Sequence, residues 1–288
     1  MSLSLADRIA VWPQYLLPQK LLTAAANKIS NARHPWVRRP LIGAFRRLFP
    51  VKLSEAAKPD PSQYDSFNAF FTRALRNDAR PLAPAGHRLI SPCDGTLSQL
   101  GRISGDQLVQ AKGVLYSAAD LLGSQEWAGR FADGRFMTIY LAPYDYHRVH
   151  APMAGRPVEE SRIPGELFSV STRTARAVPG LFARNERMSV ILETEYGPVA
   201  VVMVAAMLVA GIETVWRPGG PYRPEETLIR EPLDTAPLKR GQELGRFHWG
   251  STVILLTPTG FPDWLPTLMP GQIMRLGQAL TAEEPDIV

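Results

Sequence analysis

The sequence predicts an α+β protein, in which a strand-rich body forms a barrel or sandwich and follows N-terminal amphipathic helices. Before residue 80, apolar residues recur mainly at helical spacing. After Pro81 and Pro84, short apolar runs alternate with proline and glycine, a pattern typical of strands. With 288 residues and an apolar share of 45%, the chain can bury a substantial core. We therefore expect a basic helical region over residues 1–80 and a β-rich domain over residues 81–288.

The N-terminal region carries the excess positive charge. Residues 1–52 contain nine Lys or Arg and one acid, Asp7, which gives +8 and leaves −3 for the rest of a chain whose total is +5. Bulky residues such as Trp12, Tyr15 and Trp36 are interleaved with these cations, and no apolar span of about 20 residues accompanies them. This pattern indicates helices that lie on an anionic membrane surface, although helices that dock on the body remain the alternative. Nucleic-acid binding fits less well, because no signature of a nucleic-acid-binding fold is present.

Three further features bear on membranes and redox state. Asp7, Arg8, Pro13 and Pro18 interrupt the start of the chain, which argues against a signal peptide. Residues 196–212 lack charge, but their valines and their short length predict two buried strands and not a membrane span. Cys93 is the single cysteine, so the chain cannot form an intrachain disulfide.

Local patterns predict several elements of the body and its approach. We expect helices over residues 65–75 and 117–122 and a strand over residues 136–142. Residues 181–187 form a polar segment that is either a charged turn, which the local pattern favours, or a loop that faces a ligand.

The stretch Gly250-Ser251-Thr252 stands directly before the apolar run Val253 to Leu256. Gly250 lacks a Cβ, so its carbonyl is open to attack by the Ser251 hydroxyl. Such an attack converts the amide to an ester, and elimination and hydrolysis then leave a pyruvoyl group in place of the serine. A pyruvoyl carbonyl forms a Schiff base with an amine and accepts electrons. Taken alone, the motif is more often a turn before a strand, so its interpretation depends on partners elsewhere.

Three other residues are candidate partners of Ser251. Asp94 precedes Gly95 in a turn signal, and the simple explanation is an aspartate that bonds its own backbone. His147 and His150 follow a predicted strand, three residues apart, and are candidates for acid–base catalysis or for structural histidines. We expect no metal, because a third ligand of Cys or His type and a zinc-site spacing are both missing. In the order Asp94, His150, Ser251, an acid, a base and a nucleophile could act together.

The chain resembles the phosphatidylserine decarboxylases of the prokaryotic type over nearly all of its length. The matching motifs, in chain order, are Lys58-Pro59-Asp60, Phe67-Asn68 with Phe70-Phe71, Pro92 with Asp94-Gly95, Ser98 to Gly101, Gln110 to Gly113, Asp145 to His150, Pro164 to Val170, Leu181 to Arg187, Ile212 to Trp216 and Gly250 to Thr252. One departure is Trp249, where the family usually has leucine or another aliphatic residue.

The resemblance implies self-cleavage between Gly250 and Ser251 into chains 1–250 and 251–288, which stay associated. It implies that His150 takes the Ser251 proton, that Asp94 holds the imidazole of His150, and that Ser251 becomes a covalent pyruvoyl cofactor. The implied reaction decarboxylates phosphatidylserine to phosphatidylethanolamine and CO2, with His147 as the proton donor. The implied location is the cytoplasmic face of the cell membrane, as a peripheral protein and a possible homodimer.

Two alternatives of other kinds stay open at this point. In a non-enzymatic membrane-associated binding protein, His147, His150 and Ser251 would be structural. A serine hydrolase would retain an intact Ser251, although the Gly-x-Ser-x-Gly elbow of the α/β-hydrolases is absent.

Overall fold

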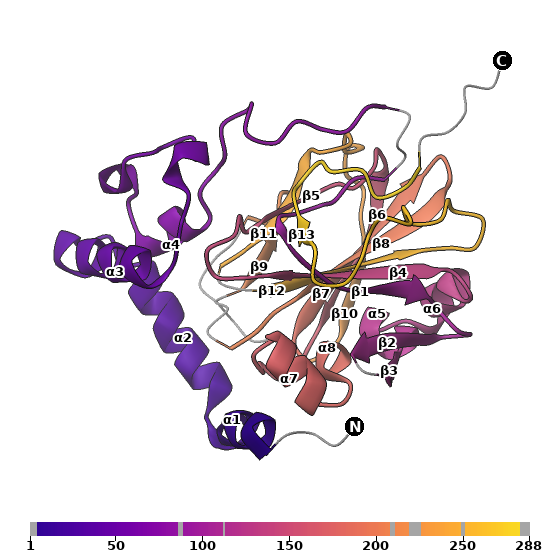
Figure 1. The fold of residues 1–288 in the computed structure, drawn as a ribbon, viewed down its shortest axis with the longest axis horizontal. Helices are drawn as coiled ribbons and strands as arrows, with labels where there is room; N and C mark the ends of the chain where they lie inside the picture. The colour runs from indigo at the N-terminus through magenta and orange to yellow at the C-terminus, as the bar shows by residue number, and fades with distance from the viewer. Residues whose placement is uncertain are drawn as a thin grey trace.

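The structure is a computed structural model that describes residues 5–85, 89–111, 113–207, 211–218, 226–248 and 251–282, with side chains from residue 11 onward. A single antiparallel sheet of eight strands forms its centre (Figure 1). From one edge to the other, the strands are β10 (Ile229–Pro232), β6 (Arg156–Ile163), β7 (Arg187–Thr194), β8 (Gly197–Val204), β12 (Ser251–Thr257), β4 (Arg135–Leu141), β1 (Gly95–Arg102) and β13 (Ile273–Met274).

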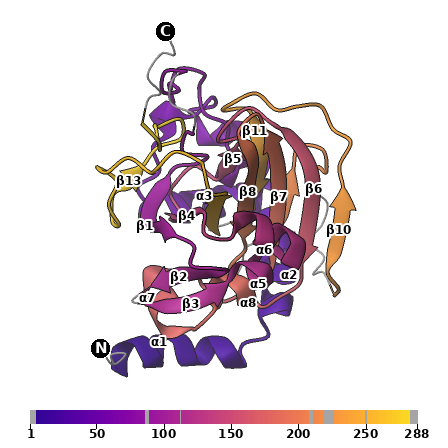
Figure 2. The same cartoon turned by 90° about the vertical axis from the view of Figure 1, so that its right-hand side faces the viewer.

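Two smaller sheets and four short helices complete the body. One sheet has the order β5 (Arg148–His150), β11 (Glu243–Phe247) and β9 (Ile212–Thr214), and the other pairs β2 (Gln107–Ala111) with β3 (Val114–Ser117). The helices are α5 (Ala118–Leu122), α6 (Gln125–Phe131), α7 (Thr172–Ala177) and α8 (Leu181–Arg184). Figure 2 shows β2, β3, α5 and α7 gathered at one end of the central sheet, on the side where α1 lies.

The N-terminal region consists of helices that lie beside the sheets and not within them (Figure 1). They are α1 (Leu5–Leu16), α2 (Gln19–Ser30), α3 (Pro35–Leu48) and α4 (Phe67–Phe71), with the 3-10 turns η1 (Leu53–Glu55) and η2 (Pro61–Gln63) before α4. Pro35 occupies the first turn of α3, where its missing N–H leaves no bond unmade, and the Ser66 hydroxyl caps α4 by accepting from the Ala69 amide. Phe45 of α3 packs on the aromatic rings of α4 and so holds these two helices together.

Strand β12 is the most deeply buried element of the central sheet. All seven of its residues are buried, and it pairs with β4 on one side and β8 on the other. An apolar strand such as Val253 to Leu256 is expected in this position because both faces of the sheet are covered. Burial of each large apolar side chain contributes about 1.5 to 3 kcal/mol, so β12 has a strong preference for the middle of the sheet.

These observations confirm the α+β class and decide between its two predicted forms. The central sheet has edge strands β10 and β13, so it is open, and the sheets are arranged in a sandwich-like way; the barrel form was wrong. The strand predicted at 136–142 and the helix at 117–122 correspond to β4 and α5, while the helix predicted over 65–75 is confined to α4. Residues 196–212 contain β8 and lead into β9, as predicted, and no described helix is long and apolar enough to cross a membrane.

The segment over residues 181–187 is not a charged surface turn. It forms α8 and the start of β7, and Asn185, Glu186 and Arg187 are buried. The Arg187 guanidinium donates to the carbonyl oxygens of Asp120, Leu121 and Asn185, which satisfies its donors without a carboxylate partner. The charged residues of this segment therefore lie buried where α8 meets β7.

Candidate functional site

The candidate residues lie near one end of three adjacent strands of the central sheet. Ser251 begins β12 and pairs with Leu141, the last residue of β4. Gly95 begins β1 directly after Asp94, and its neighbour Thr96 pairs with Tyr140 of β4. A Cβ at Gly95 would lie 2.5 Å from the Tyr140 carbonyl oxygen, so this close approach of β1 to β4 requires glycine. The pairing of β1 and β12 with β4 thus brings Asp94 and Ser251 to the same end of these strands, one on each side of β4.

The two histidines come from the segment that continues directly beyond β4. This segment runs from Ala142 through His147 into β5, which pairs with β11. The Phe247 amide donates to the His147 carbonyl oxygen at 2.9 Å, and the His150 amide donates to the Pro92 carbonyl oxygen at 2.8 Å. Backbone bonds therefore tie the histidines both to the strand that leads toward Ser251 and to the turn that contains Asp94.

Ser251 is fully buried, and its hydroxyl oxygen has no hydrogen-bond partner among the residues that the structure describes. A buried hydroxyl without a bond costs about 1 to 3 kcal/mol, so such a group in a native core requires an explanation. A hydroxyl that reacts with its own backbone is such an explanation, because it is needed free. Trp249 and Gly250, and with them the predicted cleaved bond, lie outside the described residues.

Asp94 is held by cations and not by histidine. Its carboxylate accepts from Arg80 Nε at 2.9 Å and Nη2 at 2.6 Å, from Arg275 Nη1 at 3.1 Å and from the Leu276 amide at 2.8 Å. Burial raises the pKa of Asp94, but the bonds from Arg80 and Leu276 outweigh burial and bring this pKa below its ordinary value. Asp94 is therefore an ionised anchor between the turn before β1 and the segment after β13.

The expected contact of Asp94 with the His150 imidazole is not formed, which corrects the predicted means of orientation. His150 Nδ1 donates to the Gly241 carbonyl oxygen at 2.8 Å, and the Tyr146 hydroxyl donates to Nε2 at 3.0 Å. Burial lowers the pKa of His150, so the imidazole is neutral and this tautomer is fixed. Asp94 acts on His150 through the turn whose Pro92 carbonyl oxygen bonds the His150 amide, and through its charge, which raises the pKa of His150 less than the Gly241 bond and the Glu243 charge do.

His147 is fully buried and stacks on Phe71 of α4, with ring centroids 4.1 Å apart. Its Nε2 donates to the Pro143 carbonyl oxygen at 3.3 Å, while no hydrogen bond to Nδ1 is formed within the described part of the chain. Burial, with a smaller contribution from the Arg73 charge, lowers the pKa of His147 to about 3. His147 is thus a neutral and fully buried imidazole.

Asp145 is the acid in this segment that the sequence did not single out. Burial and, to a lesser degree, the charge of Asp94 raise its pKa to about 6, against the bond that Asp145 accepts from the Ala142 amide. Asp94 and Asp145 both line a cavity of about 230 Å³ beside the site, together with Arg73, Arg80 and Tyr146. Two carboxyl groups with opposite pKa shifts therefore lie close to the histidines.

A second set of residues, also missed, links the N-terminal helices to the start of β12. Gln14 and Gln19 accept from the Ser169 and Leu167 amides at 2.9 and 2.6 Å. Asn185 then bonds both the amide and the carbonyl oxygen of Phe168 and donates to the Ala205 carbonyl oxygen at 2.9 Å. Ala205 directly follows Val204, the partner of Thr252. No spacing in the sequence predicts these contacts, because they join segments far apart in the chain.

His248, three residues before Ser251, has a defined position as well. Its Nε2 donates to Glu213 at 2.8 Å, and the Asn68 amide donates to its Nδ1 at 2.6 Å. These hydrogen bonds hold His248, which precedes the predicted cleavage point, to β9 and to α4. Within the described ranges, no group of three or more His, Cys, Asp or Glu could hold a metal ion.

The N-terminal helices expose large apolar side chains. Trp12, Leu16, Leu21, Trp36 and Leu48 are between 67% and 86% exposed, far more than is usual for side chains of this size. The alternative in which these helices bury their apolar faces on the body therefore does not account for them.

Comparison with known proteins gives a consistent result over the whole chain. A family model described as phosphatidylserine decarboxylase matches residues 67–282, and a second model, described as PSD, matches residues 9–50. A protein of Alcanivorax borkumensis named phosphatidylserine decarboxylase proenzyme is 46% identical, with 97% of this chain and 98% of the relative covered. Proteins of the same name from Acidovorax ebreus and Azotobacter vinelandii are each 48% identical, with 96% and 95% of this chain and 98% of each relative covered.

Proposed function

The chain belongs to the phosphatidylserine decarboxylase family, and we propose on this premise that it cleaves itself between Gly250 and Ser251 and then decarboxylates phosphatidylserine to phosphatidylethanolamine. The observation that carries the proposal is the Ser251 hydroxyl, which is fully buried at the start of a central strand and is bonded by no residue within the described ranges. Its position is where the resemblance of the Gly250-Ser251-Thr252 motif implies a nucleophile that reacts with its own backbone.

Self-cleavage consumes one molecule of water and releases one molecule of ammonia. The Ser251 oxygen attacks the Gly250 carbonyl, and the amide becomes an ester. Loss of the Ser251 α-proton then expels the Gly250 carboxylate and leaves dehydroalanine, whose amine is replaced by water with release of ammonia. The products are a chain 1–250 with a free carboxylate and a chain 251–288 that begins with a pyruvoyl group.

In this proposal His150 is the base that receives the Ser251 proton. Its neutral imidazole has the lone pair on Nε2, because Nδ1–H is engaged by the Gly241 carbonyl oxygen. The Tyr146 hydroxyl lies on that lone pair at 3.0 Å and is the group through which the proton passes. Asp94 supports the site by anchoring the turn that bonds the His150 amide and by the charge that raises the pKa of His150.

The residues around Ser251 fit a pyruvoyl group, because the position is fully buried and no described residue bonds the hydroxyl that would be lost. When formed, this group supplies an electron-accepting carbonyl that condenses with the substrate amine. We assign His147 to deliver a proton to the carbon that loses CO2, the role that the family resemblance implies for it. Phe71 stacks on its imidazole and both side chains are fully buried, which excludes water from that step.

The exposed apolar side chains of α1–α3, together with the surplus of Lys and Arg, support attachment of the protein to an anionic membrane as a peripheral protein. We assign the cytoplasmic face of the cell membrane and a possible homodimer to the same proposal.

The test uses phosphatidylserine labelled in the carboxyl carbon. The purified protein should release labelled CO2 and form phosphatidylethanolamine, and reduction with cyanoborohydride during turnover should attach the substrate to the 251–288 chain. Ser251→Ala should remain one chain and release no CO2. Turnover by an uncleaved Ser251→Ala protein would refute the proposal, and labelling of Ser251 by a fluorophosphonate would favour a serine hydrolase.

A further inference from the structure

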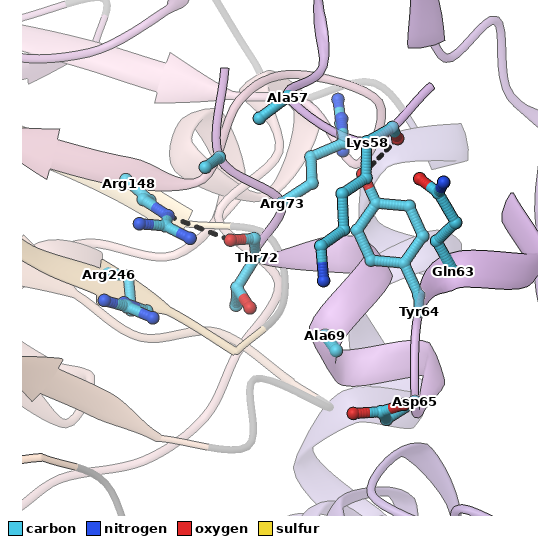
Figure 3. Close-up of a pocket in the computed structure, with 11 residues that line it drawn as sticks. Ala57, Lys58, Gln63, Tyr64, Asp65, Ala69, Thr72, Arg73, Arg148 and Arg246 are labelled. Carbon is cyan, nitrogen blue, oxygen red and sulfur yellow. Dashed lines mark hydrogen bonds between the residues drawn. The ribbon is translucent and has the colours of Figure 1, made fainter. Parts of the chain in front are cut away.

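A cavity of about 260 Å³ lies between the N-terminal region and the three-stranded sheet (Figure 3). Figure 3 shows Lys58 and Tyr64 on the helical side, Arg148 and Arg246 on the side of the sheet, and Thr72 between the two groups. The Thr72 carbonyl oxygen accepts from Arg148 Nε at 2.9 Å, and the Lys58 carbonyl oxygen accepts from the Tyr64 hydroxyl at 2.7 Å. Cations from two separate parts of the chain therefore face one space whose walls are held by hydrogen bonds.

The cations of this cavity outnumber the acids that are paired with them. Arg148 and Arg246 share Glu243, each at 2.7 Å, and Arg246 also contacts Glu213 at 3.1 Å. Asp65 is the acid among the lining residues. The Lys58 ammonium forms no ion pair with any residue that the structure describes, so it is the cation that an added anion would meet first.

Arg73 adds a buried positive charge to the same wall. Its side chain is almost inaccessible, because the residue is only 4% exposed. It donates to the carbonyl oxygens of Tyr144 and Asp145 at 3.0 and 3.1 Å, while its buried Nε bonds none of the residues described by the structure. No described carboxylate pairs with this guanidinium, and a buried charge without a counter-ion is costly. An anion in the adjoining cavity would reduce that cost.

We propose that this cavity binds a phosphate group, either as inorganic phosphate or as the phosphodiester of an acidic phospholipid, between Lys58 on one wall and Arg148 and Arg246 on the other. Guanidinium groups suit phosphate oxygens because they donate in a planar fork, and a flexible lysine adds a point charge. The bound phosphate connects the N-terminal region to β5 and β11, which lead to His150 and toward Ser251. The proposal concerns binding alone and stands independently of the self-cleavage and the decarboxylation.

The experiment measures thermal unfolding of the purified full-length protein in phosphate and in chloride at equal ionic strength and pH. Phosphate should raise the unfolding temperature of the wild type, because a ligand of the native state stabilises it. Lys58→Ala should weaken the apparent affinity for phosphate about tenfold, the usual effect of losing one charge-assisted hydrogen bond. Lys239→Ala removes an exposed lysine outside the cavity and should respond as the wild type does. Since each variant is compared with itself in chloride, any loss of basal stability cancels.

A second arm identifies the source of the phosphate group. Short-chain phosphatidylglycerol, used below its micelle concentration, presents the phosphodiester without a membrane surface. If its stabilising effect depends on Lys58, the site takes a lipid headgroup; if only the effect of inorganic phosphate does, the site takes free phosphate. Both results support the proposal that this cavity binds a phosphate group. An equal response of Lys58→Ala and Lys239→Ala to both ligands, or no response of the wild type to either, overturns the proposal.

Discussion

Replacement of Asp94 by asparagine should lower the free energy of unfolding by about 3 kcal/mol. The side chain is 2% exposed, and its carboxylate accepts five hydrogen bonds, three of them from Arg80. Asparagine retains the shape but removes the charge, and its amide nitrogen can only donate toward guanidinium groups that are donors themselves. Arg80 is then left buried with half of its counter-charge missing.

The magnitude follows from the exposure of each partner. Breaking a buried ion pair costs about 3 to 5 kcal/mol because a charge is left uncompensated. Here Arg80 keeps Glu55 at 2.6 Å, and the side chain of Arg275 is 41% exposed and so can be solvated. Both facts place the loss at the lower end of that range. Glu55→Gln removes the more exposed partner of Arg80 and should cost only about 1 kcal/mol.

The assay is urea unfolding in a Ser251→Ala background, where the chain stays in one piece. The pKa of Asp94 is lowered by folding, so its contribution to stability is complete above the ordinary carboxyl pKa of about 4 and is lost as the pH falls through the lower folded value. The difference between parent and Asp94→Asn should therefore be constant from pH 5 to 8 and shrink only below about pH 4. Equal unfolding midpoints, or a difference that disappears by pH 6, would refute the ion-pair reasoning.

Three further changes test other parts of the site. His147→Gln should still yield two chains but should lose about a hundredfold or more in turnover of lipid, and normal turnover would remove its role as proton donor. Folding raises the pKa of Asp145 to about 6, so stability falls as the pH rises from about 4 to 6; Asp145→Asn should therefore gain up to about 2 kcal/mol over the parent at pH 8 and nothing at pH 4, as read by thermal unfolding. Leu255→Ala in β12 should lower stability by about 2 to 5 kcal/mol, whereas Leu115→Ala, 54% exposed, should stay within about 0.5 kcal/mol; equal effects of the two would contradict the central place of β12.

Local sequence patterns predicted the strands and helices whose formation depends on the residues within them. The apolar run after Ser251 became β12, and the uncharged stretch after Tyr196 became β8, because burial on both faces of a sheet selects such runs. The choice between barrel and sandwich could not be made in this way. It depends on which strands stay at the edges, and the edge strand β10 lies far from its partner β6 in the sequence.

The sequence predicted the candidate residues of the site, but it did not predict the hydrogen bonds that these residues form. The sequence placed Asp94, His147, His150 and Ser251 near turns and strand ends, and the resemblance named their roles. It did not predict that Arg80 and Arg275 would take the carboxylate of Asp94, since no periodicity relates residues so distant in the chain. The tautomer of His150 was likewise set by a backbone carbonyl that only the fold supplies.

The hydrogen bonds that link the N-terminal helices to the start of β12 could not be predicted either, because their partners are also far apart in the chain. Gln14 and Gln19 look like ordinary polar residues of an amphipathic arm, yet each accepts from a backbone amide of the loop that Asn185 ties to Ala205. Polar residues that satisfy the backbone of a distant loop carry no local signal.

The intact mass of the purified active protein tests the central claim most directly. The account predicts two chains, residues 1–250 with a free carboxyl end and residues 251–288 with a blocked amino end, whose masses sum to the precursor plus one water minus one ammonia. Active protein with the mass of one uncut chain, or a second chain that begins with an ordinary serine amine, would contradict it.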